Sequence, residues 1–195
     1  MAGAKSPVEN EVKLRVESPQ AAAELLERSG FAVIHPRIFE SNDVYDTPEN
    51  SLRARGELLR LRDTGGTPVL TFKGRETPGP HKNRPEFETS LDDARALREI
   101  FERLGLDVRF RYEKYRTEFR RGSEEGIATL DETPIGTFLE LEGEPEWLDR
   151  TARDLGFHPG QYLLKSYGSL YKEYCEAQGV TPGNMTFTPA NKGLK

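Results

Sequence analysis

Three short segments of the chain carry two carboxylates separated by one residue: Glu9/Glu11, Glu86/Glu88 and Glu140/Glu142. In an extended strand, residues i and i+2 point to the same face, so each pair places two negative charges side by side. This repulsion destabilises a fold unless metal ions or basic side chains lie close by. Carboxylate oxygens are also ligands that Mg²⁺ prefers. The pairs therefore indicate divalent-metal chemistry or close pairing with internal cations.

Basic side chains follow the same alternation as the carboxylates. Lys13 and Arg15 continue the face of Glu11, while Val12 and Leu14 fall on the opposite face. Over the whole chain, the charged faces collect the bases Lys13, Arg15, Arg60, Arg62, Lys73, Arg84, Lys114, Arg116 and Lys165, and the acids Glu9, Glu11, Glu86, Glu88, Asp131, Glu140 and Glu142. Metal ions on the carboxylates would leave these bases free for a strongly anionic ligand, and Mg²⁺ suits such a site because it keeps phosphate oxygens as ligands.

For any single strand, a charged face has a simpler interpretation, because antiparallel sheets often have one face in water. Three features of the whole chain weaken it. Charges occur on nearly every predicted strand, Arg and Glu dominate where Thr and Ser are usual, and the carboxylate pairs repeat. If the sheet closes on itself with these faces inward, the charges need counterions and a ligand, since buried charges must be paired or bound to metal.

The elements that must position these residues are mostly strands. We expect strands at Val8–Glu17, Ile34–Tyr45, Leu58–Arg62, Val69–Lys73, Glu86–Ser90, Arg109–Arg121, Ile127–Glu132 and Phe138–Gly143. Asp63–Gly66 predicts a hairpin turn, and residues 77–81 a loop. Serine or proline at the start and glycine after the end predict helices from Ser18 to Gly30, Ser90 to Gly105 and Pro145 to Gly156, and a tyrosine stripe predicts a fourth from Ser166 to Ala177.

The composition fits one globular domain. The chain has 195 residues, 35% hydrophobic and 31% charged, and a net charge of −5, so the overall charge does not predict nucleic-acid binding. No stretch approaches the ~20 apolar residues of a membrane helix. The single cysteine, Cys175, and the absence of an apolar run in residues 1–7 lead us to expect a cytoplasmic protein.

We predict a domain over residues 8–175, an N-terminal tail over 1–7 and a disordered C-terminal tail over 176–195, which shows little periodicity. The three histidines are far apart and show no ligand spacing. The chain also lacks a phosphate-binding glycine loop and a dinucleotide fingerprint. Any phosphate must therefore be bound by side chains.

The run Glu9-Asn10-Glu11-Val12-Lys13 matches the E-x-E-x-K signature of the CYTH superfamily, and further motifs follow in order. They are Leu59-Arg60-Leu61-Arg62, Thr71-Phe72-Lys73-Gly74, Arg84-Pro85-Glu86-Phe87-Glu88, Lys114-Tyr115-Arg116, Thr129-Leu130-Asp131, Phe138-Leu139-Glu140-Leu141-Glu142 and Lys165-Ser166-Tyr167. The chain thus resembles, from about Val8 to Tyr174, a superfamily that joins class IV adenylate cyclases, thiamine triphosphatases and inorganic triphosphatases, also called triphosphate tunnel metalloenzymes.

The resemblance implies an α+β fold built on a closed eight-stranded antiparallel β-barrel, a tunnel with a charged interior and helices packed outside. It assigns triphosphate binding to Lys13, Arg60, Arg62, Lys73, Arg84, Arg116 and Lys165. It assigns one or two divalent metals, Mg²⁺ or Mn²⁺, to Glu9, Glu11, Asp131, Glu140 and Glu142. Lys13 and Tyr45 are the candidates for activating water, and Glu86 and Glu88 for orienting the bases.

Three functions fit these expectations. The first is metal-dependent hydrolysis of a triphosphate, either inorganic tripolyphosphate, thiamine triphosphate or a nucleoside triphosphate. The second is class IV adenylate cyclase chemistry, which converts ATP to cyclic AMP and pyrophosphate. The third is non-catalytic binding of a polyphosphate or nucleotide, which the carboxylate pairs disfavour because acids hinder anion binding. We expect a small-molecule triphosphate as partner, without nucleic acid or membrane, and a monomer or homodimer.

Overall fold

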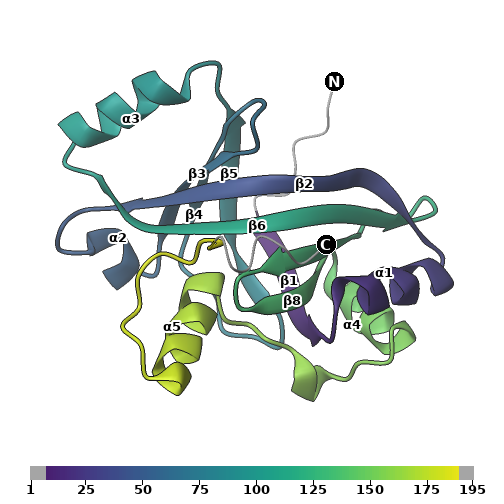
Figure 1. The fold of residues 1–195 in the computed structure, drawn as a ribbon. Coiled ribbons are helices and arrows are strands. Elements are labelled where there is room, and N and C mark those ends of the chain that lie inside the picture. Colours follow the sequence, from purple (N-terminus) through teal and green to yellow (C-terminus); the bar gives the residue numbers. More distant parts are fainter. Residues whose placement is uncertain (1–7, 189–195) are drawn as a thin grey trace.

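The computed structural model describes residues 8–188. Its eight strands form one antiparallel sheet that closes into a ring in the order β1-β5-β4-β3-β2-β6-β7-β8 (Figure 1). The strands are β1 (Val8–Val16), β2 (Phe31–Asp46), β3 (Leu58–Asp63), β4 (Val69–Lys73), β5 (Lys82–Ser90), β6 (Asp107–Arg121), β7 (Ile127–Thr133) and β8 (Gly136–Glu142). The closed eight-stranded sheet predicted from the sequence is confirmed.

The α-helices of residues 8–188 lie outside the ring, as predicted, and are α1 (Pro19–Arg28), α2 (Ser51–Ala54), α3 (Ala94–Arg103), α4 (Pro145–Asp154) and α5 (Tyr167–Gln178). The short α2 and a 3₁₀ turn at Pro159–Gln161 were not predicted. Ser18 caps α1 as expected, but Asp93 caps α3 in place of Ser90, because β5 continues to Ser90. Within residues 8–188, no helix has the length and apolar character needed to cross a membrane.

The hydrophobic core lies between the outer face of the ring and the helices. Val12, Leu14 and Leu139 are fully buried in a cluster that the outer faces of β1, β7 and β8 form with α1 and α4 (Figure 1). A second cluster packs α3 against β2 and β3, with Phe101 against Leu61. This burial of apolar area outside the ring stabilises the closed sheet and leaves its inner face to polar side chains.

Strand β5 begins four residues earlier than predicted. Its first half pairs with β1, with Glu11 opposite Lys82 and Glu9 opposite Arg84. Its second half pairs with β4, with Lys73 opposite Glu86. This one strand therefore bridges β1 and β4, and it carries basic and acidic side chains onto the same inner face.

The segment after α5 packs along β6, so the disorder predicted for residues 176–195 does not hold for 176–188. Met185 is fully buried, its amide donates to Arg111 O at 2.9 Å, and its carbonyl accepts from Glu113 N at 2.9 Å. The ring of Phe187 also contacts Tyr115. The segment takes the edge of β6 that β7 leaves unpaired, because β7 pairs with β6 only from Tyr115 onward. The tails predicted for residues 1–7 and 189–195 lie outside the described residues.

Candidate functional site

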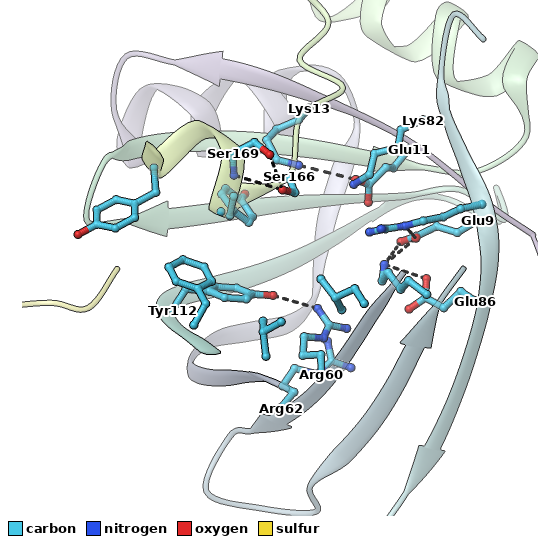
Figure 2. Close-up of a pocket in the computed structure, with 18 of the residues that line it drawn as sticks. Glu9, Glu11, Lys13, Arg60, Arg62, Lys82, Glu86, Tyr112, Ser166 and Ser169 are labelled. Carbon is cyan, nitrogen blue, oxygen red and sulfur yellow. Dashed lines mark hydrogen bonds and ion pairs between the residues drawn. The ribbon is translucent and has the colours of Figure 1, made fainter. Parts of the chain in front are cut away.

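The inner face of the ring surrounds a cavity of about 540 Å³, lined mainly by charged side chains. Figure 2 shows side chains from β1, β3 and β5 that point into this space. Of the predicted site residues, the structure brings together around the cavity Glu9, Glu11, Lys13, Tyr45, Arg60, Arg62, Lys73, Arg84, Arg116, Glu140 and Glu142. The charged interior inferred from strand alternation is therefore present.

Lys13, the lysine of the E-x-E-x-K run, lies fully enclosed between two carboxylates. Its Nζ donates to Glu140 Oε1 at 2.5 Å and lies 3.9 Å from Glu11 Oε1. Burial disfavours the ammonium, but Glu140 and Glu11 outweigh it and raise the pKa of Lys13 above its usual value. In this arrangement Lys13 is a cation, which suits it to stabilising negative charge rather than to accepting a proton.

Glu11 holds a second lysine, Lys82, which the sequence analysis did not single out. The two residues face each other on β1 and β5, and the Lys82 ammonium donates to Glu11 Oε1 (Figure 2). Burial opposes ionisation of Glu11, but Lys82 and Lys13 outweigh it and lower its pKa below the usual range. Lys82 could have been found as the residue two positions before Arg84, on the same strand face.

Glu9 and Glu86 share a single ammonium group. Lys73 Nζ lies 2.8 and 2.6 Å from the two Glu9 oxygens and 2.9 Å from Glu86 Oε2. Burial and the negative charge of Glu11 raise the pKa of Glu9 to about 7, although Lys73 lowers it. Glu9 is therefore the inner carboxylate whose charge is held least firmly by its neighbours.

Asp131 lies behind the cavity wall and is fully buried. It accepts from Lys114 Nζ at 2.9 Å, from Arg116 Nε and Nη2 at 2.7 and 2.6 Å, and from the Tyr167 hydroxyl at 2.7 Å. Four hydrogen bonds occupy its oxygens, so this placement suits orienting Lys114 and Arg116 better than the predicted metal binding. Arg116 also reaches Glu140 with Nη2.

Arg60 and Arg62 extend from β3 into the cavity. Arg60 donates to Tyr112 Oη at 3.2 Å and to Thr71 Oγ1 at 3.0 Å. Arg62 Nη2 lies 3.6 Å from Glu88 Oε1, which also accepts from Arg60 Nη2 at 3.5 Å. Burial opposes the Arg60 charge, but Tyr112 and the surrounding carboxylates raise its pKa. Glu88 thus orients these bases, as predicted.

Two predicted residues differ from the others in their surroundings. Tyr45 lines the cavity, but its ring packs against Phe101 of α3 in the outer cluster, with centroids 4.9 Å apart, so its catalytic role stays a prediction that this packing does not favour. The register of β2 shifts between Val44 and Tyr45, which changes the alternation there. Lys165 is more than half exposed, donates to Glu173 and does not line the cavity, so its predicted role in phosphate binding is not supported by this arrangement.

One part of the cavity lining is aromatic. Phe110 stacks between Tyr112 and Tyr171, with centroids 5.9 and 6.0 Å apart, and Val44 lies alongside. The start of α5 lies next to them, since a Cβ atom on Gly168 would lie 3.4 Å from the ring of Phe110, and Ser166 and Ser169 of this region line the same cavity. The tyrosines of α5 were predicted to pack in the core. Tyr167 and Tyr171 also line the cavity, because α5 docks beside it. The cavity thus joins a charged region to an aromatic one.

The donor chemistry fits a hard divalent cation, because Glu9, Glu11, Glu140 and Glu142 offer carboxylate oxygens from the adjacent strands β1 and β8. The arrangement of these carboxylates, however, does not form a ready metal site. Among residues 8–188, no three Asp, Glu, His or Cys side chains are grouped closely enough to hold a metal. Glu9, Glu11 and Glu140 are each bonded to a lysine instead. A metal would have to displace these internal cations.

The comparisons with known proteins agree with the fold. The CYTH domain family matches residues 8–167. A protein named "Putative adenylate cyclase MJ0240", from Methanocaldococcus jannaschii, is 29% identical over 136 residues, which cover 69% of this chain and 76% of that protein. With the family match spanning most of its length, the chain belongs to the CYTH family.

Solved structures show the same fold. An X-ray structure described as a "putative adenylate cyclase" from Vibrio parahaemolyticus is similar, with a TM-score of 0.74 and 23% identity over 85% of this chain and 98% of that one. The PH1819 protein of Pyrococcus horikoshii has a TM-score of 0.70 and 24% identity, over 85% of this chain and 99% of that one. A Hippeastrum protein is described as a "putative adenylyl cyclase" with a dominant triphosphatase activity. Its TM-score is 0.58 and its identity 22%, over 89% of this chain and 97% of that one.

Proposed function

We propose that the protein hydrolyses the phosphoric anhydride of a triphosphate with Mg²⁺ or Mn²⁺ inside the ring. The observation that carries the proposal is the convergence of lysine and arginine side chains from β1, β3, β4, β5 and β6 on one cavity that also holds three carboxylate pairs. Pure anion binding needs the bases but is hindered by the acids, whereas phosphoryl transfer with metals uses both.

Phosphoryl transfer requires mainly positioning and charge stabilisation, and the inner side chains suit both tasks. Arg60 and Arg116 offer planar groups that can hold two phosphate oxygens, and Lys13 and Lys73 offer point charges. Asp131 holds Lys114 and Arg116 in place from behind. A bound divalent metal, held by Glu9, Glu11, Glu140 and Glu142, would neutralise charge on the phosphate oxygens.

A second candidate is adenylate cyclase chemistry, in which the ribose 3′-hydroxyl attacks the α-phosphorus of ATP and pyrophosphate leaves. The aromatic part of the cavity favours it, because Phe110 and Tyr171 could contact a base next to a bound triphosphate. The printed names of the Methanocaldococcus and Vibrio proteins point the same way. We rank hydrolysis first because it requires only the charged region.

One assay separates the candidates. The purified protein is incubated with Mg²⁺ or Mn²⁺ and with tripolyphosphate, thiamine triphosphate or ATP, and the products are resolved by chromatography and ³¹P NMR. Orthophosphate from any of these, lost in Arg116→Ala, supports hydrolysis. Cyclic AMP with pyrophosphate contradicts hydrolysis and supports the cyclase. Tight binding without turnover of any triphosphate supports a non-catalytic module.

We further propose a cytoplasmic protein that acts on a small-molecule triphosphate as a monomer or homodimer. Cys175 is free and buried in the helix α5, so the fold uses its only cysteine as a small packed side chain. Such use is typical of proteins that work in a reducing compartment. Fractionation of cells that produce the protein, followed by detection with an antibody, tests the location.

A further inference from the structure

Lys82 is a buried charge whose part in the site no sequence motif assigns. It opens β5 directly opposite Glu11 of β1, and only 6% of its surface is exposed. Its ammonium donates to Glu11 Oε1, and it lines the same cavity as Lys13 and Arg84 (Figure 2). A buried ammonium is costly unless it is paired, so a charged Lys82 needs an anion within reach.

The carboxylate that binds Lys82 is also a candidate metal ligand. A lysine ammonium and a divalent cation bound to the same carboxylate lie only a few ångströms apart and repel each other, so Lys82 on Oε1 disfavours a metal on Glu11. The same competition applies to Glu9 with Lys73 and to Glu140 with Lys13. Lys82 differs from those two lysines because it also lines a second cavity, of about 270 Å³, together with residues 76–79. The residue therefore borders open space on two sides.

An ammonium released from Glu11 needs a new anion. Lys82 and Arg84 lie two residues apart on β5 and both line the charged cavity, so phosphate oxygens bound by Arg84 would be within the same region. We propose that Lys82 is an internal counter-cation that competes with the divalent metal for Glu11 and transfers to a substrate phosphate when the metal binds. The proposal rests on the proposed function and adds a coupling between metal and substrate.

The test measures Mn²⁺ binding to the purified full chain in the absence of substrate, by titration calorimetry. Lys82→Met keeps the stem of the side chain and removes its charge, and Lys82→Gln is a second neutral variant. Both should bind Mn²⁺ about tenfold more tightly than the wild type, the size of one charge-assisted hydrogen bond. Arg28→Met, at an exposed pair on α1, is the control and should bind Mn²⁺ as the wild type does.

A second measurement tests the transfer to phosphate. Binding of tripolyphosphate is titrated with and without Mg²⁺, and by reciprocity each ligand changes the affinity of the other by the same factor. In the wild type Mg²⁺ should strengthen tripolyphosphate binding, and in Lys82→Met this factor should shrink about tenfold. The thermal midpoints of all variants are recorded, so that an unfolded variant is recognised and the conclusion drawn from the other neutral variant.

The outcomes separate this inference from the proposed function. If the wild type binds Mn²⁺ and hydrolyses triphosphate but both folded neutral variants bind Mn²⁺ no more tightly, the inference is overturned and the function stands. If the neutral variants bind Mn²⁺ more weakly, Lys82 holds Glu11 ready for metal, which also overturns competition. If the wild type binds neither Mn²⁺ nor tripolyphosphate, both proposals fail.

Discussion

Lys13 and Glu140 face each other across the β1–β8 pairing, and Lys13 Nζ donates to Glu140 Oε1 at 2.5 Å. The lysine of the E-x-E-x-K run is thus already bound to a carboxylate of the opposite motif. Because Lys73 likewise binds Glu9 and Glu86, the inner charges neutralise one another in small clusters. A ligand therefore exchanges partners with these pairs rather than entering an empty positive site.

The metal role of β1 predicts a specific kinetic defect. Glu11→Gln keeps the side chain's size but removes the negative charge. We expect the metal concentration for half-maximal activity to rise at least about tenfold, since a carboxylate ligand is lost, while KM for the triphosphate at saturating metal changes less. Initial rates over a series of Mg²⁺ concentrations measure this. Glu132→Gln, which loses only an outer pair with Arg37, is the control. A change confined to KM would contradict the assignment.

Glu40 predicts a loss of stability in acid. Burial opposes its charge, but Lys114, Arg116 and other cations outweigh it and lower its pKa from 4.5 to about 2. A pKa that is depressed in the folded state stabilises the fold above about pH 4.5, and this contribution is lost as the pH falls toward 2. The free energy of unfolding of the wild type, measured in urea, should therefore fall over this interval by on the order of 3 kcal/mol because of this group.

In Glu40→Gln the free energy of unfolding should depend less on pH over the same interval, because most of the loss of stability is already present at pH 7. Glu24→Gln, on the exposed surface of α1, should follow the wild type. Equal slopes for the wild type and Glu40→Gln would mean that the fold does not hold the Glu40 charge as described.

Gly126 predicts a steric limit on the outer face. A Cβ atom there would lie 2.3 Å from the ring of Trp147, which packs flat over the backbone of this glycine. Gly126→Ala must displace Trp147 from its buried place, so we expect a loss of unfolding free energy of about 3 kcal/mol or more. Gly66→Ala, where the nearest atom is 3.8 Å away, is the control. Equal midpoints for the two variants in urea would contradict the packing of α4.

Met185 tests whether the segment after α5 is part of the fold. Its side chain is fully buried against Tyr112 and Tyr167, so Met185→Ala should lower the unfolding free energy by about 2–5 kcal/mol. Val180→Ala, in the same segment but 53% exposed, should change it by less than about 0.5 kcal/mol. Urea denaturation of both variants measures the difference. A neutral Met185→Ala would show that the segment does not contribute.

Strand alternation made the inner charges predictable, because side chains two residues apart share a face wherever pairing is regular. This rule puts Arg60, Arg62 and Glu140 on the charged faces, and the resemblance to the CYTH superfamily predicted that these faces point inward. It fails at Tyr45, where the β2–β6 register shifts, and the ring turns to the outer cluster. Lys165 lies outside any strand, so no alternation fixes its direction.

Other features depend on contacts between distant segments. Lys82 was missed because it directly follows the loop predicted at residues 77–81 and precedes the predicted start of the strand at Glu86. Pro85 is tolerated because its carbonyl, which accepts from Gly74 N, carries the pairing there. Met185 lies in a segment without periodicity, and its burial follows from the edge of β6 that β7 leaves open.

The central claim is that the inner face of the ring binds a triphosphate, and two arginines of the same sheet test it. Arg60 is buried inside the ring, whereas Arg37 pairs with Glu132 on the outer surface. Calorimetric titration with tripolyphosphate and Mg²⁺ should show binding by the wild type and by Arg37→Ala, and affinity at least about tenfold weaker for folded Arg60→Ala. Equal affinities for the two variants, or no binding by the wild type, would contradict the account.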